Sequence, residues 1–298
     1  MVRFISEQDI SNLKISNEEC LAWVQEALVE KEFAYLPAKE SIKPSKDVFF
    51  TSMPCLLKKE QVYGLKMVSR IPGRIPALDS DLLLYNAETG ELKAFIEADW
   101  ITSMRTGAVA AYSILELAPE SYSNISCIGL GNTFRATLDI LLPLITKPLT
   151  IRLRKYKDQA EKAIERYKQF DNIRFEIIDN DEAFFREADV VLSCVTCCDG
   201  NMAKDEWFKE NVLVVPVHTL GFQNCDLFFD RVVIDDYEHT KKFKYFNEFK
   251  NLTELNDVKN LTENDKVGRI LVYNVGIALH DVYFASKIVE RIEQNKNM

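Results

Sequence analysis

Short apolar runs, separated by turn-like or helical stretches, form the hydrophobic pattern of the second half of the chain. Such runs occupy residues 149–153, 173–178, 189–193, 212–215 and 231–234, and they are rich in β-branched side chains. This alternation is typical of a parallel sheet whose strands are joined by crossover helices. The pattern therefore predicts an α/β fold with a doubly wound parallel sheet.

Before about residue 121 the pattern is different, because helical segments there are combined with pairs of strands. Residues 17–29 have an apolar face and acidic side chains in the first turn, which predicts an amphipathic helix. A separate α+β domain is therefore expected, to which a final helix returns. Its predicted strands lie at residues 48–53, 62–68 and 81–86, and its predicted helices at 101–117 and 282–293.

A glycine motif, ISCIGLGNT, stands at residues 125–133, where an apolar run meets a helical pattern. Gly129 suits a tight turn, and Gly131 lets backbone N–H groups approach a pyrophosphate at the positive end of the following helix. Phe134 departs from the motif, because the third position normally holds a small residue. An ordinary strand–turn–helix is the alternative for this segment alone, but the strands that follow favour a Rossmann-type dinucleotide-binding unit.

The end of the next strand bears on the choice of dinucleotide. Arg154 and Lys155 stand where an NAD-binding unit usually places an acid on the ribose. Basic side chains there suit a 2′-phosphate, so NADP(H) is favoured over NAD(H). The alternative is a solvated basic pair.

Composition narrows the classes of partner and site. The 298 residues carry a net charge of −9, which argues against nucleic acid or an anionic membrane as the main partner. No long apolar run or secretory signal is present, so a cytoplasmic location is expected. The seven cysteines are an odd number in mostly apolar stretches, and the three histidines form no pair at ligand spacing, so reduced thiols and no metal site are expected.

Five segments together resemble the ornithine cyclodeaminase/mu-crystallin family, and they span nearly the whole chain in the order found in that family. They read GLK at 64–66, ETG at 88–90, ADWITSMRTGA at 98–108, IGLG at 128–131 and VGIALHD at 275–281. The resemblance implies a homodimer. It also implies a substrate-binding and dimerisation domain of residues 1–120 and 275–298 around a Rossmann domain of residues 121–274.

The resemblance further implies hydride chemistry on an amino acid. In the cyclodeaminase, the dinucleotide accepts hydride from Cα of ornithine, the side-chain amine attacks the imine, ammonia leaves, and the returned hydride gives proline. Ketimine reduction and opine- or alanine-type amino acid dehydrogenation are the alternative activities. A further alternative is a crystallin-like binding protein without turnover, which a helix displaced by Phe134 would favour.

An imine beside a carboxylate needs cations and proton carriers. Arg105 matches the family's arginine and has the fork geometry that binds a carboxylate; a surface arginine at a helix end is the alternative. Lys66 lies in an apolar strand, where an inward-facing lysine binds carboxylate or assists proton transfer; a solvated lysine on an edge strand is the alternative. Lys39 falls where the family usually has a second carboxylate-binding arginine, and Lys43 is close enough to contend.

The segment after residues 212–215 departs from the cyclodeaminase. His218 stands near the position of that enzyme's acid/base aspartate, and Asp226 is a second source of negative charge. A capping or ribose-contacting histidine and a solvated aspartate are the alternatives. The remaining candidate cofactor contacts are Thr106, Asn132 and Thr133 at the phosphates, and Val195 and Thr196 at the nicotinamide.

Overall fold

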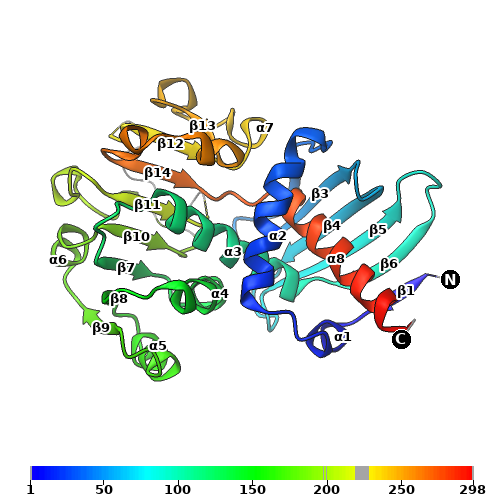
Figure 1. The fold of residues 1–298 in the computed structure, drawn as a ribbon, viewed down its shortest axis with the longest axis horizontal. Helices are drawn as coiled ribbons and strands as arrows, with labels where there is room; N and C mark the ends of the chain where they lie inside the picture. Colours follow the sequence, from blue (N-terminus) through cyan, green and yellow to red (C-terminus); the bar gives the residue numbers. More distant parts are fainter. Residues whose placement is uncertain (1, 197, 199, 219–227, 297–298) are drawn as a thin grey trace. The chain divides into compact units, whose positions relative to one another are not determined.

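The computed structural model describes residues 2–196, 198, 200–218 and 228–296 (Figure 1). The chain forms two compact units. Unit 1 comprises Met1–Arg105 and Ile277–Met298, and unit 2 comprises Thr106–Gly276. The predicted combination of a parallel sheet with a second sheet is confirmed.

Unit 1 is built on a six-stranded sheet in the order β1-β6-β5-β4-β3-β2. Neighbouring strands are antiparallel, except that β1 runs parallel to β6. Helix α3 (Asp99–Leu117) begins in this unit and continues into unit 2. The other elements of unit 1 are β1 (Arg3–Ile5), α1 (Glu7–Asn12), α2 (Asn17–Glu30), η1 (Lys31–Phe33), β2 (Glu40–Ile42), β3 (Phe49–Leu57), β4 (Val62–Arg70), β5 (Leu78–Asn86), β6 (Leu92–Glu97) and α8 (Ala278–Lys296).

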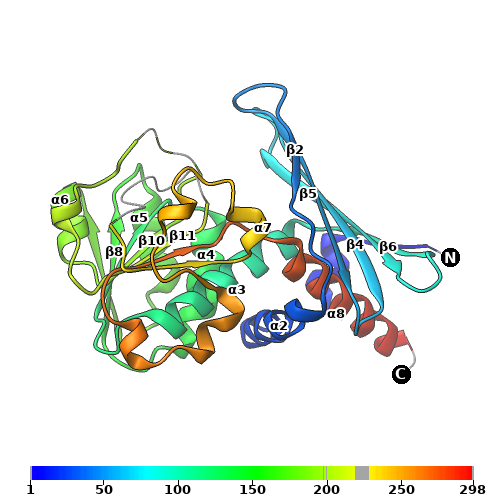
Figure 2. The ribbon, with the colours of Figure 1, turned by 90° about the horizontal axis from the view of Figure 1, so that it is seen from above.

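One face of this sheet packs against helices, and α8 contacts β3, β4 and β5 while α2 packs on α8 (Figure 2). Burial alternates along the strands accordingly, as on β3, where Thr51, Met53, Cys55 and Leu57 are buried. The opposite face is only partly buried, although many of its side chains are apolar. Ser52, Asp81 and Glu97 form a polar row with Met67 on this face. The apolar side chains there are Phe4, Pro54, Leu56, Tyr63, Leu65, Met67, Leu83, Tyr85 and Phe95.

Unit 2 contains an eight-stranded sheet in the order β13-β12-β14-β11-β10-β7-β8-β9, with every neighbouring pair parallel. The strand order reverses between β7 and β10, and doubly wound sheets bind ligands at the carboxyl ends of strands at such a point. Its elements are β7 (Asn124–Ile128), α4 (Asn132–Leu141), η2 (Leu142–Leu144), β8 (Leu149–Arg154), α5 (Gln159–Tyr167), β9 (Ile173–Ile178), α6 (Asp181–Arg186), β10 (Val190–Ser193), η3 (Asp205–Trp207), β11 (Leu213–Pro216), β12 (Arg231–Ile234), α7 (Tyr237–Thr240), η4 (Phe246–Glu248), β13 (Thr253–Glu254), η5 (Leu255–Asn260), η6 (Glu263–Lys266) and β14 (Ile270–Tyr273).

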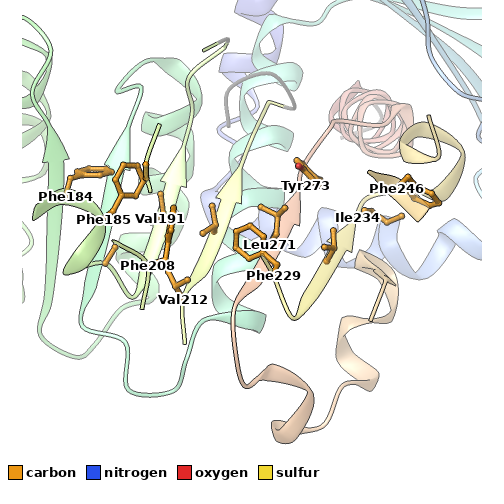
Figure 3. Close-up of a cluster of buried hydrophobic side chains, with 14 residues drawn as sticks. Phe184, Phe185, Val191, Phe208, Val212, Phe229, Ile234, Phe246, Leu271 and Tyr273 are labelled. Carbon is orange, nitrogen blue, oxygen red and sulfur yellow. The ribbon is translucent and has the colours of Figure 1, made fainter. Parts of the chain in front are cut away.

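A cluster of buried aromatic and aliphatic side chains from this sheet and its connections forms part of the core of unit 2 (Figure 3). Phe185 packs against Phe184 and Phe208, and Val191, Leu271 and other strand residues complete the cluster. The expected crossover helices α4, α5 and α6 follow the first three strands. Between β10 and β11, however, the described residues contain only the short helix η3.

Candidate functional site

A buried cluster of two cations and one carboxylate lies in unit 1. Lys66 on β4 donates from Nζ to Asp281 Oδ1 at 2.8 Å, and Arg105 on α3 donates from Nε to the same oxygen at 2.9 Å. The side chain of Asp281, on the first turn of α8, is 0% exposed, and those of Lys66 and Arg105 are 1% and 7% exposed. The three side chains carry a net charge of +1 when all are ionised.

The packing of α8 on the sheet explains why Lys66 faces inward. It lies in the middle of a central strand, opposite Met53 on β3 and Leu82 on β5, on the face that packs against α8. Gly64, two residues earlier on the same face, allows this close packing. A Cβ atom added there would lie 2.4 Å from Val282 Cγ2, the residue after Asp281.

The three groups change one another's protonation. The pKa of Lys66 is lowered to about 8, chiefly by burial; the charge of Asp281 opposes this shift, and that of Arg105 adds to it. Burial alone would raise the pKa of Asp281, but Arg105 and Lys66 together hold that pKa below its usual value. Asp281 is therefore ionised at neutral pH, and Lys66 is a lysine that titrates near physiological pH.

The guanidinium of Arg105 has two terminal nitrogens that form a fork. Among the described residues, its hydrogen bonding is confined to Nε, and its two terminal nitrogens have no partner. Two parallel N–H donors in one plane match the two oxygens of a carboxylate. Arg105 can therefore hold Asp281 and a substrate carboxylate at the same time.

Asp281 and its neighbour in the sequence, His280, have buried polar atoms that find no partner among the described residues. Asp281 Oδ2 accepts no hydrogen bond from the described residues, and the same holds for both ring nitrogens of His280. Burial lowers the pKa of His280 to about 3, and the charge of Arg105 acts in the same direction, so the imidazole is neutral.

The two lysines considered as a second carboxylate contact lie in different surroundings. Lys39 precedes β2, is half-buried, and is close enough for its charge to lower the pKa of Lys66. Lys43 follows β2 and is exposed. Of the two, Lys39 is the one that acts on the cluster.

The glycine motif of unit 2 forms the expected strand–turn–helix. Gly129 has φ of +82°, and a Cβ atom there would lie 2.6 Å from the backbone of Cys194 and Val195. Gly131 is the N-cap of α4 and faces open space. Phe134 is buried in α4, which begins directly after Gly131, so the helix forms at the expected position. An open helix N-terminus after a glycine turn fits a dinucleotide pyrophosphate.

Other candidate cofactor contacts in unit 2 lie as follows. Arg154, at the end of β8, pairs with Asp181 at 2.8 Å and Asp179 at 3.3 Å, while Lys155 is exposed. The Asn132 side chain accepts a hydrogen bond from Arg135. Thr133 begins α4 with Asn132, Thr106 lies half-buried on α3, and Val195 and Thr196 follow β10.

Of the two candidates for the acid/base residue, only His218 is among the described residues. His218 lies two residues beyond β11 and is half-buried. Asp226 lies outside the described residues. Among the described residues, no group of three or more His, Cys, Asp or Glu side chains is arranged to hold a metal ion. No helix among them has the length and apolar character needed to span a bilayer.

Sequence reasoning assigned no role to Asp281 or His280, although both lie in the segment at residues 275–281. A signal was present, because the two polar residues interrupt the apolar run from Ile277 to Phe284. An acid on the apolar face of a helix needs a buried cationic partner.

Comparison with known proteins identifies a family and several more distant relatives. A model of the ornithine cyclodeaminase/mu-crystallin family matches residues 2–296. Nodulation efficiency protein NfeD of Rhizobium meliloti is 24% identical, over 98% of this chain and 96% of that protein. N-((2S)-2-amino-2-carboxyethyl)-L-glutamate dehydrogenase of Staphylococcus aureus is 23% identical, over 72% of this chain and 68% of that protein.

A solved structure has the same fold over nearly the full length. It is the Delta(1)-pyrroline-2-carboxylate reductase of Thermococcus litoralis, in complex with NADH and L-proline. The TM-score is 0.83 at 20% identity, and the match covers 99% of this chain and 98% of the reductase.

Proposed function

Because the chain belongs to the ornithine cyclodeaminase/mu-crystallin family, we propose that it is a dinucleotide-dependent enzyme acting at the α carbon of an amino acid through an imine. The buried cluster of Lys66, Arg105 and Asp281 is the observation that carries the proposal. It combines a forked cation for a carboxylate with a lysine that titrates near neutral pH, and an imine beside a carboxylate requires both.

In this proposal Arg105 binds the substrate carboxylate through its two terminal nitrogens, while its Nε stays bonded to Asp281. The substrate's negative charge neutralises the net charge of +1 on the cluster. Lys39 adds a positive charge near the same place. These contacts orient the neighbouring α carbon.

Lys66 moves the proton. In the reductive direction, its protonated Nζ gives a proton to the imine nitrogen, which forms the N–H bond of the amine. In the oxidative direction, neutral Lys66 takes a proton from the substrate ammonium. The bound dinucleotide supplies or accepts the hydride at the α carbon. A pKa of about 8 lets Lys66 act in either direction near neutral pH.

The dinucleotide pyrophosphate is assigned to Gly129, Gly131 and the N-terminus of α4, with contacts from Asn132 and Thr133. NADP(H) is favoured, because Lys155 is exposed and the carboxylates that pair with Arg154 are themselves largely exposed. Such exposed pairs contribute about 0–1 kcal/mol, so a 2′-phosphate can displace them at small cost. Parallel titrations with NADPH and NADH test this preference, and equal affinities would contradict it.

Two groups of reactions in the family contain the proposed step. Cyclodeamination of ornithine to proline and ammonia uses it in both directions, and ketimine reduction or opine- or alanine-type amino acid dehydrogenation uses it once. His218, near the position of the cyclodeaminase's aspartate, favours the second group. An imidazole pairs less well than a carboxylate with the second ammonium of ornithine.

Assays with defined substrates test the proposal. The purified protein is given reduced dinucleotide with a cyclic 2-imino acid or with pyruvate and ammonia, and oxidised dinucleotide with L-ornithine. Turnover of any of these, lost in Lys66→Met while dinucleotide binding is retained, supports the proposal. Proline and ammonia without net change of the dinucleotide identify a cyclodeaminase. Dinucleotide binding without turnover of any substrate would refute an enzyme and leave a crystallin-like binding protein.

A homodimer is proposed from the partly exposed face of the unit 1 sheet. Solvated faces of antiparallel sheets normally carry polar side chains, but this one carries Tyr63 and Tyr85 side by side and Phe4 stacked on Phe95. A second copy of the chain would remove these rings from water.

A further inference from the structure

One carboxylate oxygen serves both cations of the candidate site. Asp281 Oδ1 accepts from Lys66 Nζ at 2.8 Å and from Arg105 Nε at 2.9 Å, across sequence separations of 215 and 176 residues. All three side chains are buried. No step proposed above requires Asp281 to touch the substrate, so its role is a separate question.

We propose that Asp281 is a positioning residue that orients Lys66 and the fork of Arg105 and keeps the transferable proton on Lys66. This inference rests on the proposed function, because it concerns the same substrate site. Without the carboxylate, two neighbouring cations would repel one another in a buried place, and the lysine would relieve the repulsion by losing its proton. Bonding Arg105 through Nε also fixes the plane in which its terminal nitrogens lie.

The groups around Lys66 identify Asp281 as the one that keeps Lys66 protonated. The charged groups that shift its pKa are Arg105 on α3, Lys39 before β2 and Asp281 on α8. The neutral imidazole of His280 and the buried thiol of Cys55 on β3 are titratable groups that interact with Asp281. Burial, Arg105 and Lys39 disfavour the protonated lysine, whereas the charge and hydrogen bond of Asp281 favour it.

The test compares wild type with Asp281→Asn, which keeps the shape and an acceptor oxygen but removes the charge. The titration of Lys66 is followed by NMR on protein with 13C-labelled lysine, assigned with Lys66→Met, in the absence of substrate. The midpoint is expected near pH 8 in wild type. It should fall by at least about one pH unit in Asp281→Asn. The free energy of a hydrogen bond to a charged group corresponds to a pKa shift of about that size.

The matched control is Asp189→Asn in unit 2, whose carboxylate pairs with Lys209 at 2.6 Å and which should leave the Lys66 midpoint unchanged. A purely structural role would lower folding stability without moving the Lys66 midpoint. Equal midpoints in wild type and Asp281→Asn therefore overturn the inference. If Asp281→Asn does not fold, Arg105→Met is the second variant. Asp281 then serves Lys66 alone without the opposing cation, so the Lys66 midpoint should rise, and an unchanged or lower midpoint overturns the inference.

Enzyme assays separate this inference from the proposed function. With an active substrate, the alkaline limb of kcat/KM for reduction should move to lower pH in Asp281→Asn by the same amount as the NMR midpoint. A shifted NMR midpoint without turnover of any substrate in wild type would support the role of Asp281 and refute the proposed reaction. Activity whose pH profile is identical in both proteins would refute the role of Asp281.

Discussion

Replacing Arg105 by lysine separates its two tasks. In the arginine, Nε holds Asp281 while the two terminal nitrogens remain available to a substrate carboxylate. Lysine keeps the positive charge but has one nitrogen, which is needed by Asp281. Arg105→Lys should therefore fold normally and bind substrate poorly.

The size of the effect follows from the lost contact. A hydrogen bond to a charged group contributes about 1.5–3 kcal/mol, and about 1.4 kcal/mol is a factor of ten, so kcat/KM should fall roughly 10- to 150-fold. The free energy of unfolding should change by less than about 1 kcal/mol, because the buried Asp281 keeps a cationic partner.

Three measurements check this reasoning on the same protein. Initial rates with the active imine or amino acid give kcat/KM, a fluorescence titration gives dinucleotide affinity, and thermal unfolding gives stability. Arg3→Lys is the matched control, because Arg3 also pairs with a carboxylate of α8, Glu293, but near the protein surface. An unchanged kcat/KM in folded Arg105→Lys would refute carboxylate binding by the arginine fork. A loss of dinucleotide affinity as large as the loss of kcat/KM would refute the assignment of Arg105 to the substrate.

Three further outcomes are expected. Gly64→Ala should lower the free energy of unfolding by about 1–3 kcal/mol, because the added Cβ meets Val282, and Val282→Ala should recover part of the loss in thermal unfolding of the double variant. Full stability of the single variant would contradict the close packing of β4 and α8. Gly129→Ala should greatly weaken dinucleotide binding, measured by fluorescence, because an alanine is strained at this positive φ and its Cβ would meet nearby backbone atoms. Wild-type affinity would show that the pyrophosphate does not bind at this turn. Leu65→Glu should convert a dimer into a folded monomer in light scattering after size exclusion, and an intact dimer would place the interface elsewhere.

The local parts of the fold were predictable from the sequence. Period-two and β-branched patterns predicted the strands at 173–178 and 231–234 with the bounds that the structure has. The turn at Gly129 and Gly131 was predictable because glycine readily adopts backbone angles that other residues disfavour, and Gly129 has a positive φ in the structure. These features depend on neighbours a few residues away, which a single sequence contains.

Contacts between distant segments were not predictable in the same way. Nothing in the periodicity of residues 278–296 indicates that this helix lies on β4, so Asp281 could not be assigned to Lys66 across 215 residues. Similarly, Arg154 was placed correctly at a strand end, but its pairing with Asp181 depends on where α6 begins. Lys66 is intermediate, because its strand was predicted but its inward direction depends on the packing of α8.

The division of unit 1 into two sequence segments has a consequence for the order of folding during synthesis. Its sheet is translated first, yet α8, which covers that sheet and brings Asp281 to Lys66, is made only after the whole of unit 2. Domains generally fold as they emerge, so the Rossmann-type unit can form while the first sheet still exposes the apolar face meant for α8. During that interval strand edges and apolar side chains are open to aggregation. We therefore expect the chain to depend more on chaperones during synthesis than during refolding of the full-length chain, in which α8 is present from the start.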